Sequence, residues 1–176
     1  MPIHTERLIL RKVLPSDWRA VQRIALDFAE SPYVHYDHLM PTSDHAVQSV
    51  VRFFSESGMV WAAVLPGEDE IIGYVCTWPG EDVIEIGYRF HSAHHRQGYG
   101  YEAVSAVMRH LNEKHGGCVF RAGTALDNTP SVRLLAKLGF TLTGTEDISF
   151  HKDPWGNDIV FRAGTYEADM RCSAAR

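Results

Sequence analysis

The sequence reads His94-His95-Arg96-Gln97-Gly98-Tyr99-Gly100-Tyr101-Glu102-Ala103 where an apolar run, Val83 to Phe90, gives way to a helical pattern that continues to about His115. The apolar run predicts a strand, so the two glycines lie at a strand-to-helix junction, where the backbone can approach a ligand without a Cβ in the way. The first backbone N–H groups of a helix have no partner within it and carry partial positive charge. Arg96 adds a full positive charge beside them. The junction therefore predicts a binding site for a phosphate or pyrophosphate group.

The loop on its own is compatible with more than one interpretation. Gly98, Gly100 and Ala103 also satisfy the G-x-G-x-x-G/A pattern of dinucleotide-dependent oxidoreductases, with Asp127 as the acid that would bind a ribose. A glycine-containing loop that binds nothing is the plain structural alternative. The dinucleotide interpretation is disfavoured because the chain shows one parallel strand–helix–strand unit, and its tightly connected early strands do not belong in a doubly wound sheet.

The segment that follows the helical pattern carries a second set of motifs. A strand-like run, Cys118 to Ala125, leads into Asp127-Asn128-Thr129-Pro130-Ser131, and the short helix predicted there closes in Lys137-Leu138-Gly139-Phe140. A Gln-Gly-Tyr-Gly loop after a strand, followed by Asn-x-x-Ser and Lys-Leu-Gly-Phe, resembles the GNAT superfamily of acetyl-CoA-dependent N-acetyltransferases. The N-terminal Thr-Glu-Arg-Leu-Ile-Leu-Arg, Thr5 to Arg11, is similar to its Rim-like branch, the ribosomal-protein N-terminal acetyltransferases. The resemblance covers about residues 5 to 165.

Hydrophobic periodicity predicts the order β-α-α-β-β-β-α-β-α-β-β in a single domain, with a core over about 5–166 and a tail over 167–176. The early strands are joined by tight turns and must be antiparallel, whereas Val83–Phe90 and Cys118–Ala125 are joined by a helical crossover and should be parallel. The expected fold class is α/β (α+β), with a mixed, mostly antiparallel sheet of about seven strands, one parallel pair, and helices on both faces. This order agrees with the GNAT fold.

Composition limits the classes of function. The chain has 176 residues, 45% of them hydrophobic and 22% charged, which is typical of a soluble globular domain. A net charge of −5 argues against broad nucleic-acid binding. The cysteines are odd in number and show no ligand spacing, which favours a reducing, cytoplasmic location: Cys76, Cys118 and Cys172. No apolar run approaches ~18 residues, so no membrane association is expected.

Ten histidines raise the question of a metal site. They include two local clusters, His35 with His38 and His91 with His94 and His95. Neither cluster has the spacing of a zinc site with a second pair of ligands, so no metal is expected.

The resemblance implies transfer of an acetyl group from acetyl-CoA to a primary amine, by direct attack in a ternary complex. Backbone groups of the loop and of the preceding strand would hold acetyl-CoA, together with the side chain of Asn128. The family pattern is Arg/Gln-x-x-Gly-x-Gly/Ala, and the chain departs from it at its first position, where His95 stands and Arg96 follows. The implied cofactor-binding residues are Tyr88, Arg89, Phe90, His95, Arg96, Gln97, Gly98, Tyr99, Gly100, Tyr101, Glu102, Asn128 and Ser131.

Ser131 is the implied acid that protonates the departing thiolate, although helix capping is an alternative role for both Asn128 and Ser131. Thr129 before Pro130 fits an N-cap with proline at the first helical position. Asn128 and Ser131 are then less needed as caps, which favours their functional role.

The leading candidate for the base is Glu85, the ionisable side chain in the run Val83–Tyr88. A carboxylate with apolar neighbours there faces either solvent or a functional cleft. The alternatives are three residues of the irregular segment that in this family lines the acceptor site, and they are also the implied substrate-binding residues: His35, Asp37 and His38.

The expected partners are acetyl-CoA and an amine acceptor, with a homodimer as a further option. The acceptor is left open between a protein N-terminus, an aminoglycoside, a polyamine and another small amine. A non-catalytic CoA-binding regulatory module is the alternative to an enzyme, because Glu85 and Ser131 are both replaceable in principle.

Overall fold

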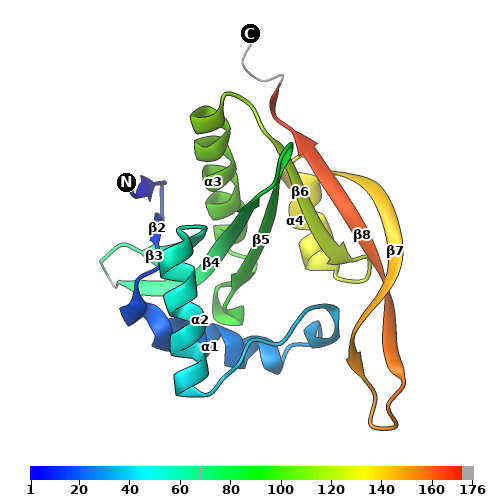
Figure 1. The fold of residues 1–176 in the computed structure, drawn as a ribbon. Helices are drawn as coiled ribbons and strands as arrows, with labels where there is room; N and C mark the ends of the chain where they lie inside the picture. The colour runs from blue at the N-terminus through cyan, green and yellow to red at the C-terminus, as the bar shows by residue number, and fades with distance from the viewer. Residues whose placement is uncertain (68, 172–176) are drawn as a thin grey trace.

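One sheet of eight strands runs through the computed structural model, which describes residues 1–67 and 69–171 (Figure 1). The strand order is β1-β2-β3-β4-β5-β6-β8-β7. The strands are β1 (Ile3–His4), β2 (Ile9–Lys12), β3 (Val60–Leu65), β4 (Glu70–Pro79), β5 (Val83–Phe90), β6 (Val119–Ala125), β7 (Thr141–Lys152) and β8 (Asp158–Asp169). The helices are α1 (Trp18–Ala29), α2 (Asp44–Ser57), α3 (Tyr99–His115) and α4 (Thr129–Lys137), with short 3-10 turns η1 (Pro15–Asp17), η2 (Val34–Tyr36) and η3 (Ser92–His94).

Neighbouring strands are antiparallel except for β5 and β6, which are parallel. The expected mixed sheet with one parallel pair is therefore confirmed, with eight strands in place of about seven. The additional strand is β1, which precedes the first strand that alternating apolar residues predict, over residues 5–13. Residues 5–8 turn rather than extend, because Thr5 N–H donates to Leu8 O and Leu8 N–H donates to Thr5 Oγ1, both at 2.9 Å.

Helices cover both faces of the sheet, and strand β3 shows why. Side chains of a strand alternate between faces. Trp61 and Ala63 belong to a core cluster with α3 and α4, whereas Ala62 and Val64 belong to a second cluster with α1 and α2. Two apolar faces thus specify a layered α/β/α arrangement. Among the described helices, none is long and apolar enough to span a membrane.

The chain's C-terminal end differs from the expectation of a tail that starts at residue 167. Strand β8 continues to Asp169, since Glu167, Ala168 and Asp169 pair with the first residues of β6. Ala168 is buried there. The predicted tail from 172 onward, with Cys172, lies outside the described residues.

The two parallel strands stay together over only part of their length. β5 pairs with β6 at Val83, Ile84 and Glu85, yet its pairing with β4 continues to Phe90 and that of β6 with β8 continues to Ala125. The sheet is therefore split beyond Glu85, and β5 and β6 diverge in Figure 1. One edge of β5 is left there without a strand partner.

Candidate active site

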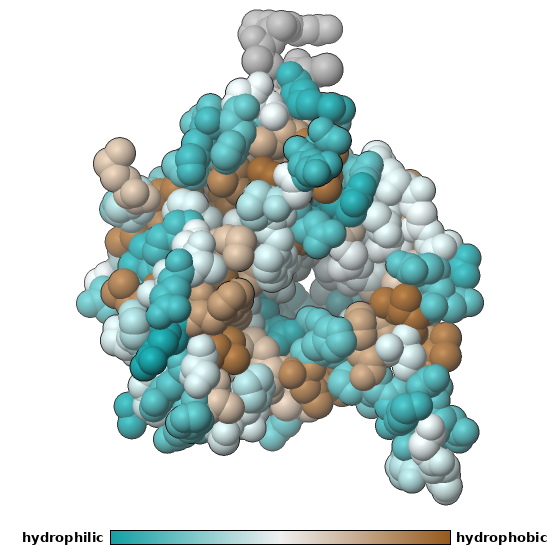
Figure 2. Space-filling model, in the orientation of Figure 1, coloured by the Kyte–Doolittle hydropathy of each residue, from teal (hydrophilic) through white to brown (hydrophobic). Residues whose placement is uncertain are grey.

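A cleft of about 1140 Å³ occupies the region where β5 and β6 separate, and Figure 2 shows the molecule hollowed at its centre. From the α3–α4 side, basic side chains of Arg96, Arg133 and Lys137 line it. From the opposite side, aromatic and acidic side chains line it together with two arginines: Phe28, Tyr33, Tyr36, Asp37, Phe54, Glu85, Arg89, Arg121, Glu146, Phe150 and Phe161. The first side is thus basic, whereas the second is rich in aromatic rings and carries charges of both signs.

Strand β5 contributes to both sides because its side chains alternate. Ile86, Tyr88 and Phe90 pack against the core cluster under α3 and α4. Glu85, Gly87 and Arg89 face the other way, since they oppose Trp78, Cys76 and Tyr74 of β4, and directly opposed residues share a face. The predicted base and Arg89 therefore lie on the side lined by α1 and the β7–β8 hairpin.

The glycine loop has the geometry that its sequence predicts. Gly98 has a φ of 86°, in the left-handed region, and caps α3, so the helix begins at Tyr99, two residues before the start at Tyr101 that its sequence pattern predicts. A Cβ on Gly100 would lie 3.4 Å from Leu134 and 3.7 Å from the ring of Phe90. A Cβ would thus make ordinary contacts there, and a longer side chain would enter the space between the helix N-terminus and a bound phosphate.

The N-terminal segment supports this loop. Arg7 donates to Gln97 O at 2.8 Å, pairs with the Glu102 carboxylate at 2.7 Å and stacks on the ring of Tyr99 at 4.6 Å. Thr5 Oγ1 donates to the same carboxylate at 2.6 Å. Burial would raise the pKa of Glu102, but the hydrogen bonds from Thr5 and Arg7 and the charge of Arg7 outweigh it and hold that pKa below its usual value.

Three of the expected cofactor-binding residues use their side chains in contacts within the protein. Glu102 does not line the cleft, because its carboxylate binds Arg7 and its N–H bonds Gly98 O at 3.0 Å. Gln97 does not line it either, and its side chain donates to Ala93 O at 3.0 Å. His95 does line it, with its Nε2 2.8 Å from Phe90 O. The other residues of that set line the cleft: Tyr88, Arg89, Phe90, Arg96, Gly98, Tyr99, Gly100, Tyr101, Asn128 and Ser131.

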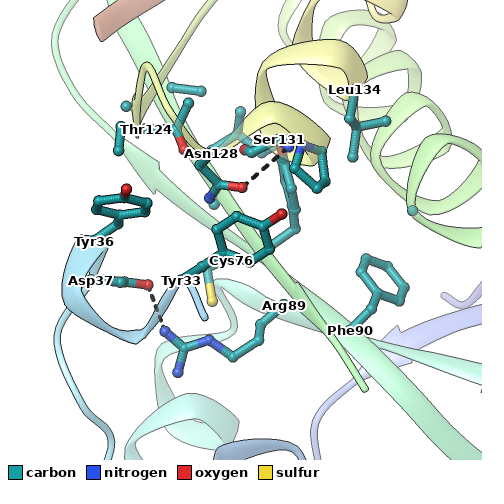
Figure 3. A pocket seen from close by; sticks show the side chains of 18 of the residues that line it. Tyr33, Tyr36, Asp37, Cys76, Arg89, Phe90, Thr124, Asn128, Ser131 and Leu134 are labelled. Atoms are coloured by element: carbon teal, nitrogen blue, oxygen red, sulfur yellow. Dashed lines mark hydrogen bonds and ion pairs between the residues drawn. The ribbon is translucent and has the colours of Figure 1, made fainter. Parts of the chain in front are cut away.

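At the start of α4, the expected N-cap at Thr129 is wrong. The cap is Asn128, whose Oδ1 accepts from Ser131 N–H at 3.4 Å (Figure 3). Asparagine is at least as good a cap as threonine, so Asn128 has a structural role besides any contact with a ligand. The hydroxyl of Ser131 is not part of this cap and lies 2.8 Å from the Tyr88 hydroxyl. Sequence reasoning named Tyr88 for its backbone and missed this side-chain contact.

On the opposite side, Asp37 and Arg89 point toward each other (Figure 3), with Oδ2 and Nη2 2.5 Å apart. His38 lines the cleft and its ring contacts that of Phe150 in a tilted arrangement, with 4.1 Å between the ring centres, whereas His35 packs edge-on against His151 and does not line it. Glu85 lines the cleft but is exposed, so the partial burial that would strengthen it as a base is missing.

The residues present fit acetyl-CoA. The two glycines leave a cradle that a side chain would fill, basic side chains surround it, and an unpaired strand edge leads from it into the cleft. Among residues 1–67 and 69–171, no three His, Cys, Asp or Glu side chains gather closely enough to hold a metal ion.

Comparisons with known proteins agree with this geometry. Two uncharacterized N-acetyltransferases of Bacillus subtilis, YnaD and YoaA, are 27% and 26% identical to the chain; the alignments cover 82% and 81% of the chain and 85% and 84% of the relatives. Among solved structures, a GNAT-family acetyltransferase from Bacillus anthracis shares 24% identity with a TM-score of 0.79, over 96% of this chain and 98% of that one. The ribosomal-protein acetyltransferase RimL, solved with coenzyme A, shares 18% identity and the same TM-score, over 97% and 99%.

The family model for the acetyltransferase (GNAT) domain matches residues 7–141. That range runs from the arginine that supports the loop to the end of the Lys-Leu-Gly-Phe motif, and it includes both strands that separate. This match covers most of the chain and favours acetyl transfer over the dinucleotide interpretation. The chain therefore belongs to the GNAT family and is an acetyltransferase that uses acetyl-CoA.

Proposed function

We propose that the protein acetylates a primary amine by direct attack of the amine on acetyl-CoA, with both substrates bound at once. The observation that carries this is the split between β5 and β6, because it opens the sheet to both faces. The basic side supplies the cradle for the cofactor, and the aromatic and acidic side supplies room for an amine. The two substrates can then meet at the split from opposite sides.

On the cofactor side, backbone N–H groups of Gly98 to Tyr101 bind the pyrophosphate, and Arg96 and Arg133 neutralise phosphate charge. The unpaired edge of β5 offers backbone groups to the pantetheine arm, and one of its N–H groups polarises the thioester carbonyl. Asn128 lies beside this arm at the start of α4.

In the reaction, the amine nitrogen bonds to the carbonyl carbon and the carbon–sulfur bond breaks. The amine gives up a proton to Glu85, directly or through water, and the departing thiolate takes a proton from the Ser131 hydroxyl. Aspartate or histidine of the segment after η2 is the alternative base, since Asp37 and His38 also line the cleft.

Initial-rate kinetics test the ternary complex. Thiol release is measured while acetyl-CoA and an amine are varied together, with hydrolysis in the absence of amine subtracted. Simultaneous binding gives double-reciprocal lines that intersect. Parallel lines would indicate an acetylated enzyme intermediate and would contradict the proposal.

A further inference from the structure

Arg89 carries a buried positive charge on the acceptor side of the cleft. Its side chain is 12% exposed, and its guanidinium carbon lies 3.9 Å from the centre of the Phe28 ring. It follows Tyr88 directly in β5, at the strand edge expected to hold the thioester. A group bound to this guanidinium would therefore lie within one side-chain length of the reacting carbonyl.

The ion pair that Arg89 makes is incomplete. Nη2 donates to Asp37 and the Tyr74 hydroxyl also interacts with the guanidinium, whereas Nη1 is buried and makes no hydrogen bond within residues 1–67 and 69–171. A guanidinium has five N–H donors in a planar fork that matches a carboxylate, and a buried charge is stable only when it is well paired. Nη1 is closed off from solvent, so an incoming carboxylate reaches this guanidinium on the Nη2 side, where Asp37 binds.

Asp37 binds that charge through one oxygen and is itself largely open to solvent. Its side chain is 55% exposed, its Oδ1 accepts from His38 N–H at 2.7 Å, and its backbone oxygen lies 2.8 Å from His151 Nε2. By contrast Arg121, which also lines the cleft, gives both Nε and Nη2 to Glu167 at 2.9 and 2.7 Å. An incoming carboxylate can replace Asp37 at Arg89 more easily than it can replace Glu167 at Arg121.

We propose that the amine acceptor carries a carboxylate close to its reactive amine, and that this carboxylate replaces Asp37 at Arg89. The inference rests on the proposed acetyl transfer. Asp37 then holds Arg89 in place while the acceptor is absent. Glu85 and Glu146 add negative charge to the lining of the same cleft, which favours a cationic amine, and the aromatic lining suits an apolar body. A free amino acid and a peptide that begins with an acidic residue both present this chemistry.

Matched acceptors test the carboxylate. Phenylalanine is compared with phenethylamine, and leucine with isoamylamine, by thiol release in the wild-type enzyme. Amidated peptides that begin with Asp or Glu are compared with those that begin with Asn or Gln, which separates the peptide source from the free amino acid. We expect the carboxylate member of a pair to have a kcat/KM about tenfold higher or more, as for a charge-assisted hydrogen bond. Hydrocinnamate, which has no amine, should inhibit competitively against the acceptor.

Substitutions at the two positions of the ion pair should act in opposite directions. Arg89→Gln should abolish the preference for the carboxylate member and the inhibition by hydrocinnamate, and Arg89→Lys should restore part of both. Asp37→Asn should lower KM for carboxylate acceptors severalfold, because it removes the competing group. Arg162→Gln is the matched control, since it breaks an ion pair with Asp147 at 3.1 Å outside the cleft.

The outcomes separate this inference from the proposed function. Equal kcat/KM within every pair, or loss of activity with all amines alike in both Arg89→Gln and Asp37→Asn, would mean that the ion pair is structural and would overturn the inference while acetyl transfer stands. If no amine releases thiol at all, the proposed function fails and the inference fails with it. The shift in melting temperature caused by hydrocinnamate, measured with CoA bound, reports on Arg89 without any turnover.

Discussion

The Tyr88 and Ser131 hydroxyls lie 2.8 Å apart and join β5 to the first turn of α4 across the cleft. Burial raises the pKa of Tyr88 to about 12, although its hydrogen bond with Ser131 acts in the opposite direction. The phenol is therefore protonated at neutral pH and can donate to Ser131 Oγ. In the proposed reaction, Ser131 directs its own proton toward the sulfur and Tyr88 is the proton source behind it.

Ser131→Ala should lower kcat about ten- to a thousandfold, within the range of lost proton transfer. The Kd for acetyl-CoA should change little, because the backbone N–H of Ser131 still meets the Asn128 cap. Steady-state kinetics and isothermal titration measure the two quantities. A variant that loses only thermal stability would show that Ser131 is structural.

Tyr88→Phe keeps the buried ring and removes one hydroxyl, so kcat should fall about tenfold, less than in Ser131→Ala. If Tyr88 acts through Ser131, the double variant should be no slower than Ser131→Ala alone, since coupled residues are not additive. The four kcat values of this cycle measure the coupling. Additive losses would place Tyr88 outside the proton path.

The cofactor loop is tested by adding a carboxylate. Acetyl-CoA should raise the melting temperature of the wild type, and Gly98→Asp and Gly100→Asp should each remove that shift. Gly98 has a left-handed φ and a Cβ there would lie 3.1 Å from Arg7 Nη2, so each shift is measured against the variant's own ligand-free melting temperature. Gly144→Asp, at an open position of β7, is the control. An undiminished shift in both loop variants would rule out the phosphate cradle.

The Glu102 carboxylate predicts a pH dependence. Its folded-state pKa is lowered, mainly by hydrogen bonds from Thr5 and Arg7 against the effect of burial. Its contribution to stability is thus present above the unfolded-state pKa, about 4.3, and is lost as the pH falls through the folded-state value. The difference in melting temperature between wild type and Glu102→Gln should be largest near neutral pH and shrink below about pH 4. A difference that does not change with pH would exclude the charge as its source.

The sequence predicts the bounds of the strands and helices better than it predicts how far apart they lie in the folded protein. The bounds of β5 match the prediction because a Pro79-Gly80 turn precedes the strand and a polar loop follows it, and its parallel pairing follows from the helical crossover. The split beyond Glu85 has no such signal, since residues on both sides of it are equally apolar. Alternation along β5 places Glu85 and Arg89 on one face, so period-two analysis alone indicates that Arg89 is an acceptor-side residue.

Local sequence patterns could not predict the contacts between segments that lie far apart along the chain. Glu102 falls within the ligand-binding motif, yet its carboxylate binds Arg7, 95 residues away in sequence. The Tyr88–Ser131 contact spans 43 residues. At Asn128 and Thr129, two good capping residues stand side by side, and sequence offers no means to choose between them.

The last prediction concerns the base. An attacking amine is mostly protonated at neutral pH and must lose a proton before or during attack. Glu85 lies on the acceptor face of β5, lines the cleft, and is the last residue of that strand to pair with β6. Glu85→Gln keeps the shape and hydrogen bonding of the side chain but cannot take up a proton. We expect it to bind acetyl-CoA normally, to lose most of its turnover, and to lose the acidic limb of the pH–rate profile.

Glu113→Gln, on the exposed surface of α3 and away from the cleft, is the matched control for loss of one carboxylate. Because Glu85 is exposed, bulk water competes for the same proton. The assignment of Glu85 as the base therefore depends on the shape of the pH–rate profile and not on the rate alone. If the acidic limb persists in Glu85→Gln, the base is a residue of the segment after η2 or water. His38→Ala would then be assayed first, since His38 lines the cleft, with His35→Ala as its neighbour outside the lining.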